Sequence, residues 1–185
     1  MNHFYENIHG WFSFDTLYTN AVQRFNDAKF VEVGCWKGRS TAFLAVEIVN
    51  SNKNIELYCV DTWLGSAEHT SVQEVVDNTL YETFLNNMKT VKDVIKPMRM
   101  TSLQAAQQFE DGTLDFVFID ASHDYENVKA DIQAWYPKVK TGGVFAGHDY
   151  KDNWPGVDQA VDEFFTVKNL SVDACDGFCW RILKP

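Results

Sequence analysis

The stretch Phe30-Val-Glu-Val-Gly-Cys-Trp-Lys-Gly-Arg-Ser40 decides the fold, because it changes from a strand pattern to a helix pattern within a few residues. Residues 30–33 form a short, largely apolar run that ends at Gly34, which is typical of a buried strand followed by a tight turn. Residues 40–49 are apolar at almost every position, which predicts a helix in the middle of the molecule. A strand, a turn and a helix in this order begin a parallel sheet.

The same alternation continues along the rest of the chain. Apolar runs at 55–60, 95–100, 114–119 and 143–146 predict further strands, and Pro97 indicates that the second of these is an edge strand. Helices are expected over 71–91, 102–109, 125–135 and 155–165, with Asp124 as the cap of the third. Residues 170–175 and 178–183, around Asp176-Gly177, predict a hairpin. We therefore expect an α/β fold with a doubly wound, mostly parallel seven-stranded sheet and a C-terminal antiparallel hairpin.

Length and composition favour one folded domain. The chain has 185 residues, of which 45% are hydrophobic and 23% charged, and this excludes a disordered or fibrous protein. We expect a single domain over 1–185, with an aromatic helical cap over 1–28 and a core over 29–185. Because 26 Asp and Glu outnumber 16 Lys and Arg, the net charge is −10. A surface of that sign repels nucleic acid and anionic lipid, so we expect neither as a partner.

Targeting signals and cysteine usage indicate a cytoplasmic protein. The first residues carry no positive segment followed by an apolar one, and no apolar run approaches the length of a membrane span. Cys35 and Cys59 lie in or beside strand-like runs and are expected to be buried thiols. Cys175 and Cys179 form a single C-x3-C pair, which is weak evidence for a metal or a disulfide and agrees with two thiols in a hairpin.

Polar residues follow five of the predicted strands, at the edge where open parallel sheets bind ligands. They are Glu32 and Gly34, Asp61 and Trp63, Thr101 and Ser102, Asp120 and His123, and His148 and Asp149. The loop after the first strand has Trp36 where a dinucleotide-binding loop needs its second glycine, so an indole blocks the pyrophosphate seat. Asp61, 27 residues after Gly34, is placed to accept hydrogen bonds from a ribose. A nucleoside with a carboxylate and no pyrophosphate describes S-adenosylmethionine.

The segments 32–40, 60–63, 118–125 and 142–149 together resemble class I S-adenosylmethionine-dependent methyltransferases. They are similar to the metal-dependent small-molecule O-methyltransferases, a group that includes macrocin-type enzymes and proteins named cephalosporin hydroxylase-like. The resemblance covers roughly residues 30–165 and implies a Rossmann-like fold. It further implies a set of cofactor-binding residues, namely Glu32, Gly34, Trp36, Ser40, Asp61, Trp63, Thr101, Ser102 and Asp120. Within this set, Ser40 would bind the methionine carboxylate, Asp61 the ribose, and Thr101 and Ser102 the adenine.

Some residues of these segments also have a purely structural interpretation: Gly34 and Gly38 as turn glycines, Ser40 as a helix cap, and Trp63 as a core residue. The resemblance places metal ligands at Asp120 and Asp149, and His148 stands where relatives usually have a carboxylate. Oxygen ligands suit magnesium or manganese, whereas a ligating His148 would shift the preference toward manganese, iron or zinc. Alternatively, His148 is a hydrogen-bonded loop residue and the carboxylates are helix caps.

His123 stands where relatives have a general base, and an imidazole takes a proton near neutral pH; a capping histidine is the alternative. The acceptor is expected to be a small hydroxylated molecule, sugar-like or phenolic. Aromatic residues within 4–18 and the stretch 149–154 could wall its pocket, pack in the core or form a homodimer contact. His3, His9 and His69 are given no role. The rival functions are a metal-dependent oxygenase, a non-catalytic module that binds S-adenosylmethionine, and a nicotinamide dehydrogenase, which Trp36 disfavours.

Overall fold

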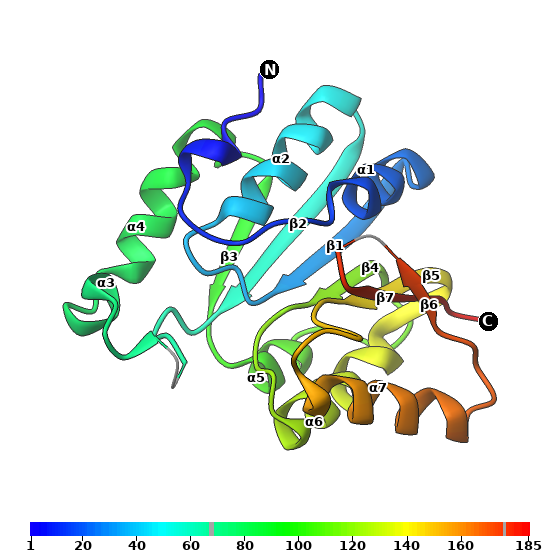
Figure 1. Ribbon diagram of the computed structural model, residues 1–185. Helices are drawn as coiled ribbons and strands as arrows, with labels where there is room; N and C mark the ends of the chain where they lie inside the picture. The colour runs from blue at the N-terminus through cyan, green and yellow to red at the C-terminus, as the bar shows by residue number, and fades with distance from the viewer. Residues whose placement is uncertain (67–68, 176) are drawn as a thin grey trace.

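The computed structural model describes residues 1–66, 69–175 and 177–185, and its centre is a seven-stranded sheet (Figure 1). The strand order is β3-β2-β1-β4-β5-β7-β6. The first five strands along the chain run parallel, β7 runs antiparallel to β5, and β6 pairs antiparallel with β7. The predicted fold class is confirmed, including the edge position of β3 and the C-terminal hairpin. The strands are β1 (Asp27–Val33), β2 (Asn54–Asp61), β3 (Ile95–Arg99), β4 (Leu114–Ile119), β5 (Val139–Gly147), β6 (Asp173–Cys175) and β7 (Cys179–Leu183).

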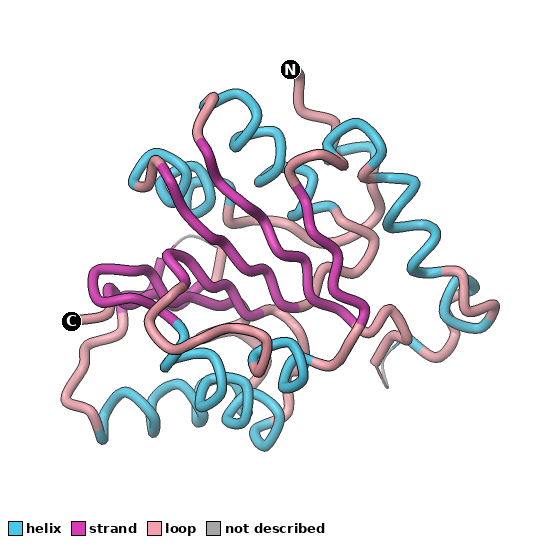
Figure 2. The backbone as a smooth tube through the Cα atoms, turned by 180° about the vertical axis from the view of Figure 1, so that it is seen from behind, coloured by secondary structure: helices cyan, strands magenta, loops and turns pink. Residues whose placement is uncertain are grey.

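Helices cover both faces of the sheet, and each face has its own apolar core (Figures 1 and 2). One core joins the sheet to α1 (Asp15–Arg24), α2 (Arg39–Ser51) and α4 (Leu80–Asn87). The other joins it to α5 (Ser102–Ala106), α6 (Tyr125–Trp135) and α7 (Pro155–Val167). The short elements are α3 (Gln73–Val76) and the 3-10 turns η1 (Tyr5–Asn7), η3 (Lys89–Val91) and η4 (Tyr136–Lys138). Every residue of β4 is buried, because β4 lies between β1 and β5 and is covered by helices on both sides.

The N-terminal segment packs most of its aromatic residues into the core on the α2 side. Phe14 and Tyr18 are fully buried, and Phe12 and Tyr5 pack against the same cluster. Trp11 is the exception, since 71% of it is exposed. The cysteines follow the sequence pattern: none of the four, all of which are among the described residues, forms a disulfide. Cys35 and Cys59 are buried, and Cys175 pairs in register with Cys179 across the hairpin.

One predicted helix is interrupted. Residues 71–91 form α3, α4 and η3 in place of a continuous helix, because Asn78 takes a left-handed conformation with φ 55° between them. The hairpin strands are shorter than predicted, and Asp176 at the predicted turn lies outside the described residues. In the described part of the chain, no helix combines the length and apolarity needed to cross a membrane.

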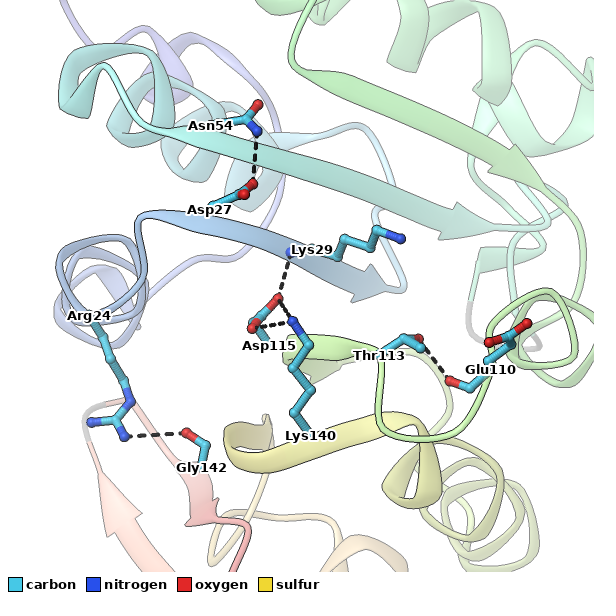
Figure 3. Close-up of polar contacts among 9 residues, drawn as sticks. All are labelled: Arg24, Asp27, Lys29, Asn54, Glu110, Thr113, Asp115, Lys140 and Gly142. Atoms are coloured by element: carbon cyan, nitrogen blue, oxygen red, sulfur yellow. Dashed lines mark hydrogen bonds and ion pairs between the residues drawn. The ribbon is translucent and has the colours of Figure 1, made fainter.

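At the amino edge of the sheet, where the parallel strands begin, polar side chains contact one another and the backbone (Figure 3). Asp115 of β4 accepts a hydrogen bond from the backbone N–H of Lys29 in β1 at 2.9 Å, and it forms an ion pair with Lys140 of β5 at 2.8 Å. One carboxylate therefore ties three neighbouring strands together. The Asp115 carboxylate at this edge therefore has its partners within the protein. The polar residues that the sequence analysis singled out lie at the opposite, carboxyl edge, where the parallel strands end.

Gly34 marks the tightest backbone approach at that carboxyl edge. It has φ +91°, and a Cβ added to it would lie 1.8 Å from the backbone oxygen of Asp120. Gly142 also has a positive φ, +77°, but a Cβ there would meet nothing within 4 Å. Alanine substitutions at Gly34 and Gly142 therefore distinguish two energy costs: both introduce strain from the left-handed backbone, and only the one at Gly34 adds a steric clash.

We expect Gly142→Ala to lower the free energy of unfolding by about 1 kcal/mol, as left-handed strain alone predicts. Gly34→Ala should cost a further ~1–3 kcal/mol or more, because the β1 and β4 ends must move apart. Urea unfolding of both variants measures the difference. Equal losses would show that the contact between Gly34 and Asp120 does not constrain the fold.

Candidate functional site

A cavity of about 790 Å³ opens at the carboxyl edge of the sheet, which is within the ~300–1,000 Å³ range of small-molecule sites. Its walls come from the loops after β1, β2, β3, β4 and β5, and from the N-terminal segment at Gly10 and Trp11. Most of the residues that the sequence singled out line it: Gly34, Trp36, Ser40, Asp61, Thr101, Ser102, Asp120, His123, His148 and Asp149. The topology thus brings together side chains from distant parts of the chain.

Asp61 holds the loop after β1 in place. Its Oδ2 accepts hydrogen bonds from the backbone N–H groups of Cys35 and Trp36, each at 2.9 Å, and its Oδ1 accepts one from Trp63 at 2.7 Å. Burial raises the pKa of the Asp61 carboxyl, and these backbone donors partly offset the rise. Asp61 also lines the cavity, so its carboxylate can contact a ligand there.

Glu32 and Trp63, which the resemblance places at the cofactor, are not among the residues that line the cavity. Glu32 is 1% exposed, and its carboxylate accepts hydrogen bonds from the hydroxyls of Tyr18 and Thr41, because strand alternation turns it toward α1 and α2. Trp63 is also 1% exposed, and its indole N–H donates to the carbonyl of Trp36 at 2.9 Å. Both residues support the loop from behind, and their contact with the cofactor stays a prediction of the resemblance.

Gly38 likewise follows its structural interpretation as a turn glycine. It has φ +91°, and a Cβ there would lie 2.7 Å from the Met88 side chain.

The wall after β3 contains a carboxylate that the sequence analysis missed. Thr101 caps α5 by accepting a hydrogen bond from the backbone N–H of Gln104, and the hydroxyl of Ser102 accepts one from the indole of Trp135 at 2.8 Å. Asp131 of α6 lines the cavity beside them and is 6% exposed. Burial raises its pKa to about 6, although a hydrogen bond from Ser102 opposes the rise. Asp131 lies three residues after Val128 and four before Trp135, so the helical spacing places all three on the same, buried face of the helix. This spacing was the signal that could have located it.

Asp120, His123, His148 and Asp149 form a compact cluster at the ends of β4 and β5. Nε2 of His123 lies 2.9 Å from Oδ2 of Asp149, and Nδ1 of His148 lies 3.1 Å from Oδ1 of Asp149 and 3.7 Å from Oδ1 of Asp120. Asp149 therefore contacts both imidazoles. Asp149 takes a left-handed conformation with φ 62°, and this conformation sets the direction of its side chain from the end of β5.

The charged groups of this cluster shift one another's pKa values. Burial and the neighbouring charge of Asp149 raise the pKa of Asp120 to about 6, against the opposing effect of His148. Burial would also raise the pKa of Asp149, but contacts with His123 and His148 outweigh it and hold that pKa well below its ordinary value. Burial lowers the pKa of His148, whereas Asp149 and Asp120 raise it, and the net shift is upward. The site therefore holds an ionised Asp149 beside a second carboxylate that it repels.

The donor set suits a divalent cation, because a cation would relieve the repulsion between the two carboxylates. Ligand atoms of Asp120, His123 and Asp149 lie within 4.8 Å of one another. The grouping differs from the predicted ligand set in containing His123, which was expected to act as a base, in place of His148. Nδ1 of His148 faces both carboxylates, and its Nε2 is buried without a hydrogen-bond partner in the described residues.

Aromatic side chains surround the outer part of the cavity. The rings of Trp36 and His69 stack with centroids 4.1 Å apart, and Trp154 lies against His123 at 4.2 Å. Trp11 also lines the cavity, with its ring 6.4 Å from His69. Trp154 confirms that part of the stretch 149–154 walls the cavity. His69 was given no role from the sequence, and no local pattern marked its contact with Trp36.

A family model described as a methyltransferase domain matches residues 31–150, which include the strands and loops around the cavity. The chain is 26% identical over 147 residues to the uncharacterized protein y4gI of Sinorhizobium fredii, and the match covers 80% of this chain. The match covers 16% of y4gI, so the chain spans about a sixth of the length of this curated relative.

Solved structures of O-methyltransferases share the fold. The O-methyltransferase NovP superposes with a TM-score of 0.70 at 17% identity, covering 92% of this chain and 78% of that one. An O-methyltransferase from Bacillus cereus in complex with SAH gives 0.63 at 20% identity, covering 92% and 80%. CalS11, a TDP-rhamnose 3′-O-methyltransferase of calicheamicin biosynthesis, gives 0.60 at 15% identity, covering 91% and 76%. At these identities the likeness establishes the fold, which is the Rossmann-like fold of class I methyltransferases.

The raised pKa of Asp131 predicts a pH dependence of stability. The folded-state pKa of about 6 exceeds the ordinary value of 3.8, so the folded protein binds this proton more tightly than the unfolded chain. The associated stability is present below pH 4 and is lost as the pH rises through 6, by about 3 kcal/mol in total. Asp131→Asn should therefore unfold at higher denaturant concentration than the wild type at pH 8, with little difference near pH 4.

Guanidinium unfolding at both pH values measures this effect. Asp173→Asn, which removes a mostly exposed carboxylate, controls for the change in net charge. The prediction fails if Asp131→Asn shifts stability equally at the two pH values.

Proposed function

The chain belongs to the methyltransferase-domain family, and on that premise we propose that it transfers the methyl group of S-adenosylmethionine to a hydroxyl of a small molecule. One observation carries the proposal: a single cavity contains both a nucleoside-type wall, with Asp61, Thr101 and Ser102, and the cluster of Asp120, His123 and Asp149. The first can hold a cofactor, and the second can activate an oxygen beside it.

The cavity residues fit the cofactor in size and chemistry. Asp61 faces the cavity with the carboxylate that also holds the loop, and Ser40 places a hydroxyl at the first turn of α2, beside the loop of Trp36. Thr101 and Ser102 border the same space from the end of β3. Each of these contacts comes from a rigid element or a hydrogen-bonded loop, which keeps the entropy cost of binding low.

Proton removal from the acceptor is the task of His123 in this proposal. An imidazole accepts a proton near neutral pH, and Asp149, 2.9 Å from Nε2, would stabilise the imidazolium that forms. The acceptor oxygen then forms a bond to the methyl carbon as the carbon–sulfur bond breaks, and the sulfonium becomes a neutral thioether. The ring of Trp154, tilted against that of His123 with centroids 4.2 Å apart, limits its movement.

A divalent cation, magnesium or manganese, would be held by Asp120 and Asp149 together with His148, while His123 acts as the base. When bound, such a cation lowers the pKa of a coordinated hydroxyl and orients it. Asp120, at the end of β4, lies against the Gly34 loop, so the carboxylate cluster is beside the proposed cofactor wall.

Cofactor binding is the first test. The wild-type protein should bind S-adenosylhomocysteine, the cofactor product, in a calorimetric titration, and Asp61→Ala should weaken binding at least about tenfold, because a charge-assisted hydrogen bond and the loop geometry are lost together. Asp115→Ala is the matched control, since Asp115 is also a buried carboxylate that accepts a backbone hydrogen bond, but lies at the opposite edge of the sheet. Equal losses in both folded variants, or no binding by the wild type, would contradict the cofactor assignment.

A second test separates catalysis from binding. His123→Gln should leave the Kd for S-adenosylhomocysteine within about twofold, and reduce methyl transfer to phenol or monosaccharide acceptors by about 10²–10⁴-fold, the usual contribution of a general base. Radiolabelled cofactor and added magnesium or manganese provide the assay, and His3→Gln is the control because His3 lies outside the cavity lining. Undiminished transfer by His123→Gln would exclude its role as the base. A non-catalytic binding module would bind the nucleoside and show no transfer in any of the three proteins.

A further inference from the structure

The C-terminal hairpin brings two thiols together. Cys175, the last residue of β6, pairs in register with Cys179, the first residue of β7. Directly opposed residues of an antiparallel pair have Cα atoms about 4.5 or 5.5 Å apart, and both separations fall within the ~4.4–6.8 Å that a disulfide spans. The two cysteines can therefore form a disulfide without a change in the register of the strands.

The two thiols differ in their access to solvent. β6 is the outermost strand of the sheet, and Cys175 is half-buried there, whereas Cys179 is 0% exposed. A hydrogen bond with Cys175, burial, and the charges of Asp120 and Asp149 raise the pKa of the Cys179 thiol well above its ordinary value. A reagent in solution therefore reaches Cys175 first, and Cys179 is the thiol held next to it.

A reversible disulfide fits this pair better than a metal or a permanent cross-link. The groups of three potential metal ligands among the described residues include neither cysteine, and zinc sites in proteins take three or four protein ligands. A disulfide between these residues would close a very short loop, and such a bond stabilises a fold less than one that closes a long loop.

The hairpin holds the end of β5 and the residues that follow it. Gly147 pairs in register with Trp180, and a Cβ added to Gly147 would lie 2.6 Å from the Trp180 ring. The backbone N–H of Tyr150 donates a hydrogen bond to the carbonyl of Phe178 at 2.8 Å. Trp180 and Phe178 are the two chain neighbours of Cys179, so contacts on both sides of this thiol flank the two cluster residues that follow β5.

The N-terminal segment provides a second connection between the hairpin and the cluster. The hydroxyl of Ser13 donates a hydrogen bond to the carbonyl of Gly177, which lies between the two cysteines in sequence, at 3.4 Å. The next residue, Phe14, is 1% exposed and packs its ring against that of His148, with centroids 5.0 Å apart. A change at the hairpin end is therefore transmitted to His148 through packed side chains as well as through the backbone.

We propose that Cys175 and Cys179 form a reversible disulfide whose formation fixes the hairpin end and steadies the segment that carries His148 and Asp149. The oxidant is a small-molecule disulfide. The Cys175 thiolate attacks one of its sulfurs and releases one thiol, and the Cys179 thiolate then attacks the Cys175 sulfur and releases the second. The protein loses two electrons and two protons, and the small disulfide takes up both to become two thiols.

Thiol mapping tests the formation of the bond, and it needs neither cofactor nor acceptor. The folded wild-type protein is equilibrated with mixtures of reduced and oxidised glutathione, denatured in iodoacetamide and mapped by mass spectrometry. We expect the chain to lose two hydrogens, with Cys175 and Cys179 protected from alkylation and Cys35 and Cys59 alkylated, because the last two are buried. Dithiothreitol should restore both thiols. In Cys175→Ser, Cys179 should stay unmodified because it is fully buried.

Hydrogen exchange measured by mass spectrometry tests the coupling to the cavity. Oxidation should slow exchange of the Tyr150 N–H, in peptides over 147–152, at least about threefold, because the hairpin end opens less often. Cys175→Ser should abolish this difference between oxidising and reducing buffers. Ala174→Ser is the matched control, since it places the same side chain one position earlier on β6, at an exposed site, and keeps both thiols. It should respond as the wild type does.

Four results would overturn the proposal. One is that all four thiols of the folded protein stay open to alkylation at every glutathione ratio. Another is a mixed disulfide with glutathione that persists on Cys175, because Cys179 would then not complete the pair. Unchanged exchange over 147–152 after the disulfide has formed would exclude the coupling to the cluster. Loss of the response in Ala174→Ser would assign it to the edge strand and not to the thiols.

Discussion

The Asp61 carboxylate is the interaction on which the cavity depends. It ends β2, and it accepts hydrogen bonds from two backbone N–H groups of the loop after β1 and from the backbone of Trp63. Trp36 and Trp63 both take left-handed conformations, with φ 50° and 52°, and these bonds keep them there. Because β1 and β2 are parallel and in register up to Val33 and Val60, the carboxylate reaches the neighbouring loop without any adjustment of the strands. The same group that shapes the loop also lines the cavity.

The two edges of the sheet divide stability and function between them. At the amino edge, the charge of Asp115 is neutralised by Lys140, and the strands are joined there by side chains that need no ligand. At the carboxyl edge, the buried acids Asp120 and Asp131 have raised pKa values because burial and neighbouring carboxylates oppose their ionisation. Such uncompensated charge reduces the stability of the ligand-free protein, and it is typical of surfaces arranged for a charged ligand.

The sequence predicts the fold well because its runs are strongly patterned: β4 is a continuous apolar segment, and α7 begins at a proline that a helix tolerates in its first turn. The edge of the sheet that carries the polar residues follows from the parallel topology. The sequence does not show which contacts form between distant segments. Gly10 meets Arg39, and His69 stacks on Trp36, through loops whose course no local pattern fixes. The resemblance alone also does not show which face of β1 a side chain occupies: Glu32 lies on the face that packs against α1 and α2, and its predicted role at the cofactor stays a prediction.

Backbone strain is concentrated where the cavity is built. Of the non-glycine residues with positive φ, Trp36, Trp63, Asp149 and Lys151 all lie in loops after strands at the carboxyl edge. Each such conformation costs on the order of 1 kcal/mol and persists only when surrounding contacts fix it. Asp61 provides those contacts for the two tryptophans, and the imidazoles of His123 and His148 provide them for Asp149. Since the residues that fix the strain also line the cavity, a substitution at Asp61 or His148 alters the loop conformation together with the ligand contact.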